Sequence, residues 1–87
     1  MSKTHEIKLM REFQEAVLSG DKSFEVRNND RGYQKGDFVK FHVTDRVNVK
    51  EPLDDVLFKI TYVLSGWHIE PGYVVFGIKM VDGGLNE

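Results

Sequence analysis

The chain has 87 residues, contains no cysteine and carries a formal net charge of −2. A chain of this length forms one domain whose core buries about 60–65% of the surface that the unfolded chain exposes. We therefore expect a single domain over residues 1–87, with no separate catalytic domain. Without cysteine, disulfides, thiol chemistry and cysteine-based metal sites are excluded. The acidic balance argues against a broad electrostatic nucleic-acid surface, although it leaves room for a local basic patch.

The sequence contains no membrane-spanning pattern. No apolar run approaches the roughly 20 residues that a transmembrane helix needs. The opening residues Met1–Glu6 lack the apolar core of a signal peptide. We therefore expect a soluble, cytoplasmic protein with no membrane partner.

The first predicted elements are a strand and a helix. Residues His5–Leu9 alternate between apolar and charged side chains, which predicts a half-buried strand with His5 on its inner face. Residues Met10–Ser19 have apolar positions at helical spacing. This pattern predicts an amphipathic helix that packs through Phe13 and Val17.

The stretch Gly20–Arg27 is where the sequence places a candidate site. The glycine supplies the left-handed residue that commonly closes a helix, and a strand follows from Lys22. Because side chains alternate along a strand, one face carries Phe24 and Val26 and the other Ser23, Glu25 and Arg27. On the protein surface, Lys22, Glu25 and Arg27 would form an ion-pair group worth about 0–1 kcal/mol. The alternative is a polar pocket, because the strand leads into a loop dense in polar groups.

Two aromatic side chains lie in predicted loops. Residues 28–36, which contain Tyr33, are rich in asparagine, aspartate and glycine. Trp67 lies in a second loop at residues 67–72. We expect both side chains to pack in the core, and the alternative for each is an aromatic wall on which a base stacks.

Three more strands are predicted in the second half of the chain. They cover Phe38–Val43, Val56–Leu64 and Tyr73–Val81, and each alternates between apolar and polar positions. In the second of these, the alternation places Tyr62 on the apolar face. Asp82–Gly84 is predicted to end the last strand.

The predicted order is β-α-β-β-β-β, which indicates the α+β class. Five strands in so small a protein would leave long unpaired edges, and closing the sheet on itself removes them. We therefore expect a small, mostly antiparallel β-barrel of about five strands, with one helix packed across an end. The alternative is an open α+β sheet that carries the helix on one face.

The candidate stretch resembles the GxKxxExR signature of ASCH domains, which belong to the PUA-like superfamily of small β-barrels. The matching positions are Gly20, Lys22, Glu25 and Arg27, and the likeness continues through Asn29-Asp30-Arg31, Gly36-Asp37 and Pro71-Gly72-Tyr73. Over nearly its whole length, the chain is similar to compact uncharacterised ASCH-like proteins of bacteria and their phages. The resemblance implies a PUA-like barrel with a cleft beside the signature, in which ASCH domains are proposed to bind RNA.

The same resemblance also implies possible catalysis. Some small ASCH members are amidohydrolases that act on acylated cytidine, and others are reported as ribonucleases. In the amidohydrolases the signature lysine assists a threonine nucleophile three residues later, where this chain has Glu25. A carboxylate cannot replace a threonine hydroxyl in acyl transfer without changing the mechanism.

The leading hypothesis is an RNA or nucleotide binding module. Lys22, Arg27 and Arg31 would contact phosphate, Glu25 and Asp30 would accept hydrogen bonds from base amino groups, and Tyr33 or Trp67 would stack. The candidate ligand-binding residues are Lys22, Glu25, Arg27, Asn29, Asp30, Arg31, Tyr33 and Trp67. One alternative is a small hydrolase acting on a modified nucleoside, with Lys22 and Glu25 as acid and base. Another is a structural or protein-interaction barrel, in which the signature only pins the helix to the sheet.

The histidines do not indicate a metal site. His5, His42 and His68 lie in different predicted elements without the spacing of metal ligands, so we expect no metal and no cofactor. His5 is predicted to be a hydrogen-bonded core histidine. The alternative for His5 is a place near Lys22.

Overall fold

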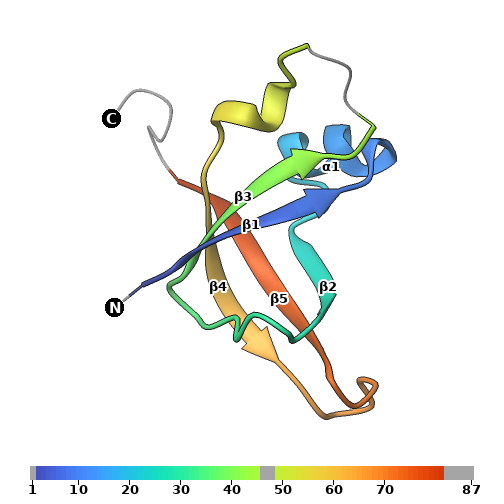
Figure 1. Cartoon of the computed structure of the whole chain (residues 1–87). Helices are drawn as coiled ribbons and strands as arrows, with labels where there is room; N and C mark the ends of the chain where they lie inside the picture. Colours follow the sequence, from blue (N-terminus) through green and yellow to red (C-terminus); the bar gives the residue numbers. More distant parts are fainter. Residues whose placement is uncertain (1, 46–48, 82–87) are drawn as a thin grey trace.

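The computed structural model describes residues 2–45 and 49–81. Five strands form one sheet in the order β1-β3-β4-β5-β2. The strands are β1 (Thr4–Leu9), β2 (Phe24–Asn28), β3 (Phe38–Val43), β4 (Phe58–Leu64) and β5 (Tyr73–Met80). The sheet curls into a half-barrel whose edge strands, β1 and β2, face each other across an open side (Figure 1). The predicted α+β class, with about five strands and one helix, is confirmed.

The sheet is mixed. Three of its neighbouring pairs are antiparallel, whereas β1 and β3 run parallel with Thr4 opposite Phe38 and Leu9 opposite Val43. The long crossover between these two strands, which contains the helix and β2, permits the parallel pairing. Full closure of the barrel is not observed, because β1 and β2 share no backbone pairing among the described residues. The open side this leaves is where the charged residues gather.

The core fills the concave inner face of the sheet. Alternate residues of β1, β3 and β5 are almost completely buried, as expected for strands with one face against a core. The largest fully buried side chains are Phe41, Phe76, Ile7, Leu53, Ile60, Val17, Val39 and Val74. The opposite faces of these strands lie toward solvent.

The predicted alternation of the fourth strand fails in its second half. The pairing of β4 with β5 shifts between Ile60 and Tyr62, and Tyr62 is 64% exposed while Val63 packs against the core. A bulge of this kind adds one residue to a strand and thereby exchanges its faces. The prediction that Tyr62 lies on the apolar face is therefore wrong.

The α-helix is shorter than predicted, because a 3-10 turn forms its first part. A 3-10 turn, η1 (Arg11–Phe13), leads into the six-residue helix α1 (Gln14–Ser19), which Gly20 closes with φ of 88°. Val17 packs in the core as predicted, but Phe13 is 37% exposed. The assignment of Phe13 to the core is wrong because its turn opens toward the cleft described below.

A second 3-10 turn braces the helical end of the half-barrel. This turn, η2 (Pro52–Asp55), begins after Glu51, whose buried carboxylate accepts two hydrogen bonds from the guanidinium of Arg11 at 2.8 and 3.0 Å. The amide of Gln14 donates to the same carboxylate at 3.1 Å. These contacts hold η1 and α1 against the connection between β3 and β4.

The last strand ends at Met80, and the predicted terminator Asp82–Gly84 lies outside the described residues. Within the described part, no helix is long and apolar enough to cross a membrane.

Candidate functional site

The charged face of β2 points into the half-barrel. Glu25 is only 3% exposed, whereas Phe24 and Val26 on the other face are 47% and 55% exposed. The interpretation of Glu25 and Arg27 as a surface ion pair is therefore wrong. The prediction that they share one surface is confirmed, and that surface is the concave one at the open side.

Glu25 is the centre of this charged cluster. Its Oε1 accepts a hydrogen bond from Nε of Arg27 at 3.0 Å, and its Oε2 accepts one from Nζ of Lys22. Charge-assisted bonds of this kind are stronger than neutral ones, and a buried carboxylate requires them because it has lost its water. We call Lys22, Glu25 and Arg27 the charged cluster.

Lys22 is held by aromatic rings as well as by Glu25. Its ammonium lies 5.2 Å from the ring centre of Phe13 and 5.3 Å from that of Phe24, within the range of cation–π attraction. It also donates to the carbonyl oxygen of Phe24 at 3.0 Å. The backbone N–H of Lys22 donates to the carbonyl oxygen of Ala16 at 2.9 Å, which ties the start of β2 to α1. The position of this cation is therefore fixed by both the helix and the strand.

Arg27 connects the two edge strands. Its Nη2 donates to the backbone carbonyl oxygen of Lys8 in β1 at 2.5 Å. We call this contact the Arg27 bridge. It spans the open side of the half-barrel, where β1 and β2 are not paired within the described sheet.

Two grooves meet at the Arg27 bridge. The first has a volume of about 510 Å³ and is lined by apolar side chains that include Met10, Phe13 and Phe24, together with the charged cluster. The second has a volume of about 530 Å³ and is lined mainly by polar side chains: Glu6, Asn28, Asp30, Arg31, Tyr33 and His42. Lys8 and Arg27 line both grooves, so the grooves are adjacent and share the bridge as a wall. We call them the apolar groove and the polar groove.

Tyr33 forms the inner wall of the polar groove. Its ring is buried between His5 and Phe76, with ring centres 4.7 and 4.6 Å away, so its predicted role as a packing anchor is confirmed. Burial raises the pKa of Tyr33, and the positive charges of Arg27 and Arg31 partly offset this effect. The ring thus belongs to the core and also lines the polar groove.

His5 is a hydrogen-bonded core histidine, as predicted. Its Nε2 lies 2.8 Å from Oδ2 of Asp37, and both side chains are buried. Burial alone would raise the pKa of Asp37, but hydrogen bonds from His5 and from the backbone N–H groups of Lys3 and Gln34 outweigh it and lower this pKa. His5 therefore completes the core beside Tyr33, and it lines neither groove.

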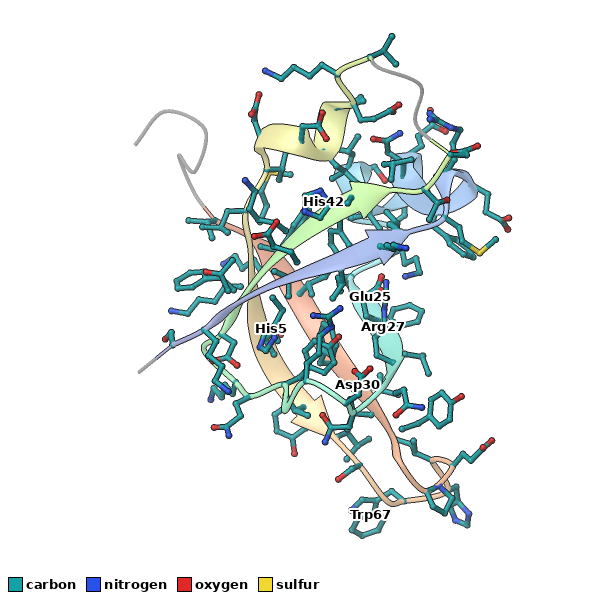
Figure 2. The ribbon with its side chains drawn as sticks, viewed as in Figure 1. His5, Glu25, Arg27, Asp30, His42 and Trp67 are labelled. Atoms are coloured by element: carbon teal, nitrogen blue, oxygen red, sulfur yellow. The ribbon has the colours of Figure 1, made fainter. Side chains whose placement is uncertain are left out.

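The remaining predicted ligand-binding residues divide into two groups. Asp30 and Arg31 are exposed and line the polar groove, whereas the side chain of Asn29 accepts a hydrogen bond from the backbone N–H of Tyr33 at 3.3 Å and shapes the loop. Trp67 is 82% exposed and lies far from Glu25 and Arg27, in the connection between β4 and β5 (Figure 2). Its assignment to the core is wrong, and it does not reach the grooves.

Several groove residues could not be found from the sequence pattern. Phe13 was assigned to the core, and Phe24 was not recognised as part of a groove wall because the apolar face of a strand normally points inward. Glu6 and His42 bond each other at 2.7 Å across β1 and β3, a pairing that depends on the parallel register of these strands. Among the described residues, no three metal-ligating side chains come together.

These features define a small α+β protein with a half-barrel sheet and a charged cleft along its open side. Residues 4–78 match the family described as "Domain of unknown function (DUF3850)", and the chain belongs to this family. It is also similar to the "Uncharacterized 12.9 kDa protein in GpA 3'region" of Escherichia phage P2, with 43% identity over 42 residues. The aligned part is 48% of this chain and 38% of the phage protein, so the likeness covers less than half of either.

Proposed function

We propose that the chain is an ASCH-type RNA or nucleotide binding module, and that its half-barrel is a PUA-like fold. The observation that carries this proposal is the place of the charged cluster. Three of the four signature positions, Lys22, Glu25 and Arg27, meet on the concave surface of an open cleft. A cytoplasmic location would give such a module access to RNA.

The electrostatics of the cleft support an anionic ligand. Among the described residues, the apolar groove is lined by Lys8, Lys22 and Arg27 against one carboxylate, that of Glu25, although the whole chain is acidic. Phosphate contacts from lysine and arginine provide most of the affinity for nucleic acids, and aromatic side chains add base stacking. The cleft combines both kinds of group.

The hydrolase alternative is supported less well. A general base must be within reach of the proton that it removes and free to accept it. Both carboxylate oxygens of Glu25 are already bonded to cations, and its side chain is 4% exposed. The geometry favours Glu25 as the residue that positions Lys22 and Arg27 for a ligand.

The direct test is binding of a short single-stranded RNA, followed by fluorescence anisotropy at several salt concentrations. Arg31→Ala is the most informative variant, because Arg31 is exposed and makes no hydrogen bond or ion pair among the described residues. We expect weaker binding and a salt slope reduced by about 0.7, the share of one phosphate contact on a single strand.

Lys59→Ala is the matched control, because Lys59 lies on β4 and lines neither groove. Equal losses for Arg31→Ala and Lys59→Ala would indicate diffuse electrostatics. Indifference of the unmodified protein to every RNA tested would refute the proposed function and favour a structural role for the signature.

A further inference from the structure

We infer that the cleft binds a single nucleotide unit across the Arg27 bridge, with its base in the apolar groove and its phosphate in the polar groove. This inference rests on the proposed function and adds the orientation and size of the ligand. It follows from the difference in chemistry between two grooves that share one guanidinium.

The apolar groove suits a planar ring. Its rim is formed by Met10, Phe13, Phe24 and Val26, which are 37–57% exposed although all four are apolar. Exposed apolar side chains gathered in one groove indicate a binding surface. A base that stacks on either phenylalanine buries this surface. The volume of the groove, about 510 Å³, is in the range of small-molecule sites.

Lys22 gives the same groove a polar contact for the base. Its ammonium has three N–H donors, of which the structure commits one to Glu25 and one to the carbonyl oxygen of Phe24. The third is available beside the two aromatic rings. A ring nitrogen or carbonyl oxygen on the edge of a stacked base would accept it, so the groove can hold a base by one face and one edge.

The polar groove suits the phosphate. Arg31 lines it with a charge that is unpaired among the described residues, Arg27 lines it from the bridge and Lys8 lies beside it, so three cations face the two carboxylates of Glu6 and Asp30. The carboxylate of Glu6 is bonded to His42. Nη1 of Arg27 also has no hydrogen-bond partner within the described part, so the guanidinium can still donate toward the groove. Asn28 adds a neutral amide donor for a sugar hydroxyl.

The test is a titration of the labelled protein with adenosine, AMP and inorganic phosphate, followed by amide chemical shifts. We expect AMP to bind more tightly than adenosine or phosphate alone. Phe24→Ala should weaken the binding of adenosine and of AMP by the same factor, about fivefold or more. Fivefold corresponds to the lower end of the range expected for one stacked base. Arg31→Ala should weaken the binding of AMP by about fivefold and leave the binding of adenosine unchanged.

Matched controls are Tyr62→Ala and Lys59→Ala, which remove an exposed aromatic ring and a cation that line neither groove. Both should bind AMP as the unmodified protein does. Equal effects of Phe24→Ala and Tyr62→Ala, or a loss of adenosine binding in Arg31→Ala, would overturn the inferred orientation. Binding of RNA without binding of AMP or adenosine would overturn the inference alone, whereas absence of all binding would remove the proposed function as well.

Discussion

Glu25 is the buried centre of the charged cluster, so its replacement tests whether the cluster supports the fold. In Glu25→Gln the side chain keeps its shape, but Lys22 and Arg27 lose their counter-charge. Removing one partner of a fully buried ion pair costs about 3–5 kcal/mol, because the remaining charge stays unpaired. Here the side chains of Lys22 and Arg27 are 20% and 24% exposed, so water offsets part of the loss. We therefore expect a decrease of about 2–3 kcal/mol in the free energy of unfolding.

The measurement is urea unfolding at neutral pH, followed by circular dichroism. Tryptophan fluorescence is a poor probe here, because Trp67 is already exposed in the folded protein. For a chain of this size the expected loss corresponds to a Tm lower by about 10–20 °C. The matched control is Glu6→Gln, which breaks an exposed pair with His42 and should cost less than about 0.5 kcal/mol.

The two variants also differ in their expected response to salt. Screening weakens exposed ion pairs much more than buried ones. The stability difference between Glu25→Gln and the unmodified protein should therefore persist in about 1 M salt. If Glu25→Gln and Glu6→Gln had equal, small effects, Glu25 would be a surface charge in solution and the described cluster would be refuted.

Three further predictions follow from other parts of the structure. Folding lowers the pKa of Asp37, so its hydrogen bonds stabilise the fold fully at pH values above its unfolded pKa near 3.8. This stabilisation is lost as the pH falls through the lower pKa of the folded state. The free energy of unfolding of Asp37→Asn should therefore fall less steeply with decreasing pH. In Gly77→Ala the new Cβ would lie 2.5 Å from Oγ1 of Thr61, so we expect a loss of about 1–3 kcal/mol in thermal unfolding, most of which the second change Thr61→Ala should restore. The third prediction is no appreciable hydrolysis of acylated cytidine in a chromatographic assay, because in the proposed likeness to ASCH amidohydrolases Glu25 stands where those enzymes have the threonine nucleophile. Turnover abolished by Glu25→Gln in a folded protein would contradict it.

Much of the fold could be predicted from local patterns. Period-two alternation placed all five strands, and a glycine after a helical period placed the end of α1 at Gly20. The inward side chain of His5 and the packing role of Tyr33 also followed from their positions. These features depend on neighbours in the sequence, which a single chain displays directly.

The features that could not be predicted depend on pairing between distant segments. Alternation is the same in parallel and antiparallel strands, so it gave no sign of the parallel β1–β3 pair. The bulge before Tyr62 exchanges the faces of β4 without any glycine or proline in that strand to mark it. The sequence also left open whether the charged face of β2 lies on the surface or in a pocket. There Glu25 is buried because its partners come from the same strand and the turn before it, and this pairing reverses the usual preference for apolar side chains inside.

The Arg27 bridge has a consequence for how copies of this protein behave toward one another. The outer edges of β1 and β2 carry backbone groups that do not pair within the described sheet, and such edges are templates on which another chain can add a strand. Arg27 occupies the carbonyl oxygen of Lys8 on one edge, and Glu25 places a buried charge behind the other. A second molecule could extend the sheet only by displacing a guanidinium and approaching a charged interior. We therefore expect Arg27 and Glu25 to hinder strand addition at these two edges as well as to shape the cleft.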